Sequence, residues 1–152
     1  MKQSIIIKQA NLSDLEGISR LFDAYRVFYK QASDLALANR FLNDRFDKGE
    51  SIIFYAKNDV GEYLGFAQLY PSFSSVSAKK IWILNDLFVS ENTRGLGVGK
   101  KLLNRIKEFA KETNSKGIAL ETDITNVNAQ GLYESLGYIK NSEHYYYFLD
   151  VD

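Results

Sequence analysis

The sequence predicts a mixed α/β fold, in which a central sheet is flanked by helices. Its 152 residues alternate between segments of two-residue and 3.6-residue hydrophobic period. These segments follow in the order strand, two helices, three strands, helix, strand, helix, strand, which is typical of an α/β sandwich. Only one proline is present, and no repeat or flexible linker divides the segments. We therefore expect a single domain over 1–152.

The amino-terminal third contains the first strand and two helices. The short apolar run 4–8 predicts the strand. Ser13 and Glu16 have the spacing of a capping box, so we expect a helix from this point to about Lys30. Apolar residues recur along it at three- and four-residue steps and give it one broad apolar face. A second helix is expected over 33–46.

Three strands are expected in the middle of the chain. The first is 52–57, and a hairpin turn over 58–61 leads into the second, 63–70. Pro71 is expected to end that second strand, because proline cannot donate a ladder hydrogen bond. The third, 79–89, is rich in Ile, Leu, Trp and Phe and leads directly into a glycine cluster.

The last third of the sequence returns to the alternation of helix and strand. An amphipathic helix is expected over 98–113, followed by a strand over 118–123. A further helix is expected from about 126 to 136, with Gly137 as its carboxyl-terminal cap. The alternating segment 145–151 predicts a final strand.

The composition excludes several classes of protein. The 19 basic and 19 acidic side chains cancel, which argues against a nucleic-acid-binding protein or one that coats an anionic membrane. The absence of cysteine excludes disulfides and thiolate chemistry, and no metal site is expected. The amino-terminal apolar run is too short for a signal peptide or a spanning helix, so we expect a cytoplasmic protein.

A glycine-rich loop between the third strand of the middle group and the helix 98–113 is the sharpest local feature. Glycines there let backbone N–H groups turn inward, and the start of the helix adds partial positive charge. The window 94–116 also holds seven basic and two acidic residues, a surplus of five. Such a loop predicts a seat for a multiply phosphorylated ligand, and its residues are Arg94, Gly95, Leu96, Gly97, Val98, Gly99 and Lys100.

Two motifs carry a resemblance to a known family. The first is Arg94-Gly-Leu-Gly97-Val-Gly99, and the second is Asn126-x-x-Ala129-x-x-Leu132-Tyr133-x-x-x-Gly137-Tyr138. Together they resemble the GNAT superfamily of N-acetyltransferases, strongly over about 80–140. Further pairs, Leu84-Asn-Asp86-Leu-Phe-Val89 with Thr122-Asp123-x-x-Asn126, look closest to the histone and polyamine acetyltransferases.

This resemblance implies a GNAT-like, mostly antiparallel sheet that is splayed where acetyl-CoA binds. It also implies acetyl transfer from acetyl-CoA to a primary amine by direct attack in a ternary complex. Backbone groups of Leu87, Phe88 and Val89 would then pair with the pantetheine arm and polarise the thioester carbonyl. Amides of the glycine loop would hold the pyrophosphate with the help of Arg94, and Asn126 and Tyr133 would complete the cofactor site.

Two side chains are candidates for proton transfer. Tyr133 would protonate the departing thiolate, since the ordinary pKa of tyrosine, near 10, suits donation to a nascent thiolate. Asp86 is the first candidate for the carboxylate that binds and deprotonates the amine through water. Strand alternation places Asp86 on the same face as Phe88 and opposite Leu87.

Other side chains are candidates for the acceptor site. Glu121 and Asp123 could form an acidic mouth for a cationic substrate, or they could cap helices and pair with lysines. Tyr25, Tyr29 and Trp82 could line the site through cation–π contacts, or they could belong to the core.

The sequence thus predicts an N-acetyltransferase that acts on a small aliphatic amine or polyamine. One alternative is the same machinery acting on a protein amine or an amino acid. A second alternative is a sensor that binds acyl-CoA without turnover, for which an acid and a base would have no use. A homodimer is expected because members of the superfamily often dimerise.

Overall fold

The computed structural model describes residues 4–152. It consists of two compact units, Met1–Glu121 and Thr122–Asp152, which are treated separately below. Within the described residues, no helix is long and apolar enough to cross a membrane.

The first unit is built on a five-stranded sheet with the spatial order β1-β2-β3-β4-β5. Its strands are β1 (Ile5–Gln9), β2 (Ile52–Asn58), β3 (Tyr63–Ser74), β4 (Lys79–Val89) and β5 (Ile118–Ala119). The first four strands pair antiparallel, and β5 pairs parallel to β4. This mixed sheet with flanking helices confirms the predicted fold class.

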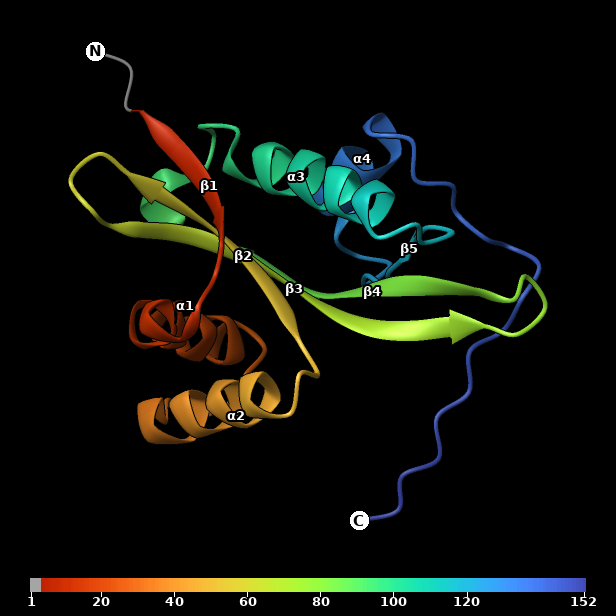
Figure 1. Ribbon diagram of the computed structural model, residues 1–152, viewed down its shortest axis with the longest axis horizontal. Helices are drawn as coiled ribbons and strands as arrows, with labels where there is room; N and C mark the ends of the chain where they lie inside the picture. Colours follow the sequence, from red (N-terminus) through yellow and green to blue (C-terminus); the bar gives the residue numbers. More distant parts are fainter. Residues whose placement is uncertain (1–3) are drawn as a thin grey trace. The chain divides into compact units, whose positions relative to one another are not determined.

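One face of the sheet is covered by α1 (Leu15–Phe28) and α2 (Leu35–Asp47), as Figure 1 shows. Phe22 of α1 is central to this layer, because its ring stacks on Phe41 of α2 and meets the edge of Phe66 of β3, with centroids 5.5 and 6.2 Å apart. The periodicity that predicted α1 therefore marks a real core-facing stripe.

The opposite face carries α3 (Val98–Glu112) (Figure 1). Phe109 of α3 packs against Phe54 of β2 and Trp82 of β4, with ring centroids 5.3 and 5.2 Å away. The apolar side of α3 is buried on this sheet face, including Leu102, Leu103 and Ile106.

The start of α1 differs from the predicted capping box. The reciprocal pair is formed by Asn11 and Asp14, not by Ser13 and Glu16. The Asn11 side chain accepts from the Ser13 N–H at 3.0 Å, and the Asp14 carboxylate accepts from the Asn11 N–H at 2.9 Å. A turn of 3₁₀ helix, Leu12–Asp14, therefore precedes α1.

The prediction that Pro71 ends its strand is wrong, since β3 continues to Ser74 and Pro71 pairs with Trp82. Trp82 donates its backbone N–H to Gly117 at 3.0 Å, on the side away from β3. The nitrogen of Pro71 therefore faces away from β4, on the side where β2 begins only opposite Leu69. No ladder donor is needed there, so proline is tolerated.

The second unit contains one regular element, α4 (Val127–Ser135), which lies within the predicted helix 126–136. Asn126 caps its amino terminus by accepting from the Ala129 N–H at 3.3 Å. Gly137 follows its end with a φ of 98°, as the sequence predicted for a left-handed cap.

Two predicted strands are corrected. The strand expected over 118–123 is limited to β5, and the residues 145–151 form no strand. A strand exists only where a neighbour accepts and donates its ladder hydrogen bonds. Alternating hydrophobicity supplies the side-chain pattern but not this partner.

A buried polar cluster fixes the start of α1 to the sheet. Asp14 is 9% exposed, and its Oδ1 accepts from the hydroxyls of Tyr55 at 3.0 Å and Tyr63 at 3.1 Å. Burial, followed by the hydrogen bond to Asp14, raises the pKa of Tyr55 to about 12, and the same causes raise the pKa of Tyr63.

We expect Tyr55→Phe to lower the free energy of unfolding by about 1.5 kcal/mol at pH 7, since it removes one hydrogen bond to a buried charge. The folded-state pKa of Tyr55 lies above its unfolded value of 10.0. Its contribution is therefore complete below pH 10 and is lost as the pH rises through about 12. Urea titrations from pH 7 to 12 measure this loss, and the exposed Tyr145→Phe is the control. Equal pH dependence in Tyr55→Phe and the wild type would contradict the assignment.

Candidate active site

The glycine loop lies between the end of β4 and the start of α3, as predicted. Gly95 and Gly97 have φ values of 86° and 77°, and Gly97 is the left-handed residue directly before α3. A Cβ at either position would meet no atom within 4 Å, so the space above the loop is open. The first N–H groups of α3 have no intrahelical acceptor. Together these features fit a bound anion.

Not all of the basic side chains over 94–116 are available to a phosphorylated ligand, because some already have partners within the protein. Arg105 forms ion pairs with Glu108 and Glu112, at 4.0 and 3.4 Å, and lies over the ring of Phe54. Lys116 donates a hydrogen bond to a serine of the β3–β4 turn. The residues of the loop that can still meet a phosphate are the exposed Arg94 and Lys100, together with the neighbouring Lys101.

Arg94 connects the loop to two other elements. Its Nε donates to the backbone oxygen of Val89, the last residue of β4, at 3.3 Å. Its guanidinium lies 6.0 Å from the ring centre of Phe28, at the end of α1. The residue predicted to bind pyrophosphate is therefore anchored at the junction of strand, loop and helix.

Strand β4 contains a β-bulge that sets the geometry of the site. Gln68 pairs with Asp86 and Leu69 pairs with Leu84, so Asn85 has no partner on β3. The ladder to β5 includes only Trp82 and Ile83. Within Met1–Glu121 the sheet is therefore open beside the second half of β4, where Leu87, Phe88 and Val89 lie.

Gly65 shows how tightly the end of β4 is held on its other side. A Cβ on Gly65 would lie 2.8 Å from the backbone oxygen of Phe88 and 3.3 Å from the Val98 side chain. Only glycine lets β3 approach β4 and the start of α3 so closely.

Asp86 is a buried carboxylate, only 3% exposed. It accepts hydrogen bonds from the Gln68 amide and from Asn85 Nδ2, the latter at 3.1 Å. Burial raises the pKa of Asp86, whereas the hydrogen bonds from Gln68, Tyr25 and Asn85 lower it. Burial raises the pKa of Tyr70, and the electrostatic interaction with the Asp86 carboxylate raises it further. A carboxylate in this setting takes up a proton more readily than an exposed one.

Aromatic rings from α1 surround the same side of the sheet. Tyr25 meets Tyr29, Phe66 and Phe88 edge-on, with centroids 5.0, 5.9 and 6.1 Å away. The Tyr25 hydroxyl also donates to the backbone oxygen of the bulged Asn85 at 3.4 Å. The structure therefore brings Tyr25, Tyr29 and Phe88 to the face that carries Asp86.

Trp82 lies on the opposite face and does not join this group. It is 4% exposed, its indole N–H donates to Thr113 at 2.9 Å, and its ring packs on Phe109. Strict alternation from Asp86 would put Trp82 on the same face, but the bulge at Asn85 reverses the alternation. The suggested role in the amine site is therefore wrong, and the core alternative holds.

The remaining predicted residues lie at or beyond the boundary of the two units. Glu121 and Asp123 are exposed and lie in no strand. The backbone oxygen of Asp123 accepts from Gln130 Nε2 at 2.9 Å, and Asn126 caps α4. Tyr133 lies in the last turn of α4, with its ring 5.7 Å from that of Tyr138.

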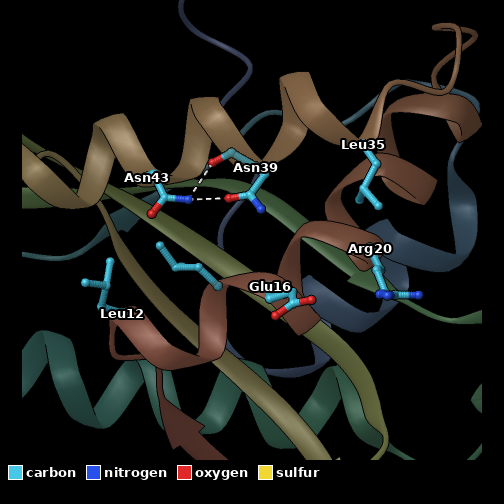
Figure 2. A pocket seen from close by; sticks show the side chains of 7 residues that line it. Leu12, Glu16, Arg20, Leu35, Asn39 and Asn43 are labelled. Atoms are coloured by element: carbon cyan, nitrogen blue, oxygen red, sulfur yellow. Dashed lines mark hydrogen bonds between the residues drawn. The ribbon is translucent and has the colours of Figure 1, made fainter.

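A hollow of about 280 Å³ lies between α1 and α2. Figure 2 shows Glu16 and Arg20 of α1 on one side of it and Asn39 and Asn43 of α2 on the other. None of the site residues predicted from the sequence lines it. Among the described residues, no group of three or more His, Cys, Asp or Glu side chains could hold a metal ion.

Sequence reasoning missed three polar residues around Asp86, namely Ser51, Gln68 and Asn85. Ser51 and Gln68 are 6% and 0% exposed. One signal was available, because Gln68 interrupts a strand that is otherwise apolar and aromatic over 63–70. The bulge at Asn85 left no such signal.

Known proteins with a similar sequence and fold identify the family of this chain. A sequence model described as "Acetyltransferase (GNAT) family" matches residues 16–138. The uncharacterized N-acetyltransferase YhfO of Bacillus subtilis (strain 168) is 46% identical over 145 residues, covering 95% of this chain and 97% of its own. The crystal structure of a probable acetyltransferase has a TM-score of 0.91 at 40% identity, covering 97% of this chain and 98% of that one.

A more distant structure shares the fold alone. It is the aminoglycoside N-acetyltransferase AAC(6')-Iy in complex with CoA, with a TM-score of 0.82 at 19% identity, covering 98% of this chain and 97% of that one.

The fold and the sequence matches define an acyltransferase of the N-acetyltransferase class. The chain belongs to the acetyltransferase (GNAT) family. Membership of this family supports acetyl-CoA as the co-substrate, and the open, glycine-rich start of α3 fits the phosphates of that molecule.

The left-handed conformation of Gly97 gives a prediction for this loop. We expect Gly97→Ala to lower the free energy of unfolding by about 1–2 kcal/mol, since a Cβ strains a backbone at positive φ although space is open around it. The matched control is Gly131→Ala inside α4, where alanine stabilises by about 0.5–1 kcal/mol. Urea denaturation of both variants measures the difference. A neutral Gly97→Ala would show that the loop relaxes without strain.

Proposed function

We propose that the protein transfers the acetyl group of acetyl-CoA to a primary amine, namely a small aliphatic amine or polyamine, by direct attack in a ternary complex. The observation that supports this proposal is the buried Asp86 carboxylate among the aromatic rings of Tyr25, Tyr29 and Phe88. A negative charge bordered by aromatic rings favours an alkylammonium ion over a neutral or anionic acceptor.

The co-substrate would bind along the open side of β4 and the start of α3. Backbone N–H groups of 95–100 would hold the pyrophosphate, with Arg94 adding charge. Backbone groups of Leu87, Phe88 and Val89 would pair with the pantetheine arm and orient the thioester carbonyl. When bound, acetyl-CoA supplies the activated acetyl group.

Asp86 would act as the base for the acceptor. An alkylammonium has no lone pair, so it must lose a proton before it can attack. Asp86 accepts that proton, directly or through water, and the uncharged nitrogen then forms a bond to the acetyl carbon as the carbon–sulfur bond breaks. The products are the N-acetylated amine and CoA.

Tyr133 would supply the proton that the leaving thiolate takes up. This assignment is supported by its place in the family motif and by the ordinary pKa of tyrosine, near 10, which keeps its hydroxyl protonated and able to donate at neutral pH. Asp86 takes up one proton from the amine and Tyr133 gives one to the thiolate, so the overall reaction is balanced once solvent has returned both groups to their starting states.

A panel of acceptors tests the proposal. The protein is incubated with acetyl-CoA and, separately, with spermidine, a short diamine, glycine, D-alanine, an aminoglycoside and a lysine-containing peptide. Release of free thiol is followed with a chromogenic disulfide. We expect the highest kcat/KM with the aliphatic amines, since these carry positive charge without a carboxylate that Asp86 would repel.

Turnover confined to the peptide or to amino acids would contradict the proposed acceptor class. Tight binding of CoA without thiol release from any member of the panel would instead indicate the sensor that the sequence left as an alternative.

The proposed acid is tested by Tyr133→Phe, which removes only the hydroxyl. We expect kcat to fall at least about tenfold while the affinity for CoA stays nearly unchanged. Calorimetry measures the affinity, and the exposed Tyr145→Phe is the control. Equal losses of turnover and affinity would show that Tyr133 has a structural role.

A further inference from the structure

A chain of three buried polar side chains crosses the sheet beneath α1. Ser51, directly before β2, donates from Oγ to Gln68 Oε1 of β3 at 2.7 Å. Gln68 Nε2 donates in turn to Asp86 Oδ2 of β4. The three residues are 6%, 0% and 3% exposed, so water does not substitute for any of these contacts.

The order of donors and acceptors in this chain is determined by its chemistry. An ionised carboxylate only accepts, so the Gln68 amide must turn its NH₂ group toward Asp86. The amide oxygen then faces Ser51 and needs a donor, which the Ser51 hydroxyl supplies. Ser51 therefore fixes the orientation of Gln68, and Gln68 fixes one oxygen of Asp86.

The second oxygen of Asp86 is held separately. Asn85 Nδ2 donates to Oδ1 at 3.1 Å, and Asn85 is the residue that the bulge places outside the β3–β4 ladder. Each carboxylate oxygen thus has its own nitrogen donor, Gln68 of β3 for Oδ2 and the adjacent Asn85 for Oδ1, which leaves the carboxylate one orientation.

Burying three polar groups in a sheet is unfavourable unless every one of them is paired. Phe66 and Leu69 beside Gln68 are fully buried, yet an apolar residue in place of Gln68 would leave the Ser51 hydroxyl and one Asp86 oxygen without a partner. The hydrogen-bonded series of Ser51, Gln68 and Asp86 therefore does more than fill the core, because it ends at a carboxylate.

We propose that Gln68 and Ser51 are positioning residues, which hold the Asp86 carboxylate in one orientation as the base for the acceptor amine. This inference rests on the proposed function, because it takes Asp86 as that base. Neither residue contacts the reacting atoms, and each acts through its neighbour in the chain.

Several other groups face Asp86, and each is unchanged in the variants below. Tyr25 lies on the α1 side and Tyr70 on β3. Arg45 of α2 acts on Tyr70 in the opposite sense to Asp86. Among the hydrogen bonds to ionised Asp86, the one from Gln68 lowers its pKa most, so replacing Gln68 raises the pKa of this carboxyl further.

The first test needs no substrate. Protein labelled with ¹³C at aspartate carboxyls is titrated by NMR, and the Asp86 signal is assigned from its loss in Asp86→Asn. We expect Gln68→Met to raise the pKa of Asp86 by at least about one unit. Ser51→Ala should raise it less, whereas Ser51→Thr, which keeps the hydroxyl, should restore the wild-type value. Gln9→Met, at an exposed position of β1, is the matched control.

The second test uses the amine of the panel that is turned over fastest. The acidic limb of kcat/KM against pH should move upward by the same amount as the NMR titration, since activity requires ionised Asp86. The KM for acetyl-CoA should not change.

These outcomes separate the inference from the function on which it rests. A folded Gln68→Met protein with an unchanged Asp86 titration overturns the positioning role alone. A shifted titration with an unmoved acidic limb, or full activity in Asp86→Asn, overturns Asp86 as the base and the positioning role with it. If Gln68→Met does not fold, the comparison of Ser51→Ala with Ser51→Thr decides the question.

Discussion

The desolvation of one carboxylate is the constraint on which the acceptor side of this structure depends. Asp86 lies on a central strand, 3% exposed, where an unpaired charge would be strongly unfavourable. The surrounding elements each contribute a polar group that offsets this cost: Gln68 from β3, the bulged Asn85 from β4 and Tyr25 from α1. The aromatic packing of α1 on the sheet thus also encloses a charge.

The bulge at Asn85 determines which side chains of β4 lie on the same face of the sheet as Asp86. By adding one residue to β4, it places Asp86 and Phe88 toward α1 while Leu84 and Trp82 face α3. The polar and aromatic face that carries Asp86 is thereby separated from the mainly apolar packing of α3. The bulge follows shortly after Ile83, the last residue of β4 that pairs with β5, so within the first unit the second half of β4 is open on that side.

These features divide into those that are local in sequence and those that are not. The glycine loop, the helix after it and the Gly137 cap were predictable, because positive φ and helix amphipathicity are encoded over a few residues. The bulge at Asn85 depends on its pairing with β3, and Asp14 of the true capping pair is also held by Tyr55, so both involve partners far along the chain. A period of two residues could reveal neither, and for the same reason it predicted a strand over 145–151 for which no ladder exists.

Arg94 connects the two sides of the candidate site within the first unit. Its guanidinium contacts Phe28 of α1 and its Nε bonds the last carbonyl of β4. From Phe28, ring contacts continue through Tyr29 to Tyr25, whose hydroxyl bonds the bulged strand. A phosphate that draws Arg94 toward the glycine loop would weaken its contact with Phe28, since one guanidinium cannot satisfy both partners fully. Packed rings thus connect the end of α1, beside Arg94, to the part of the same helix that borders the Asp86 carboxylate.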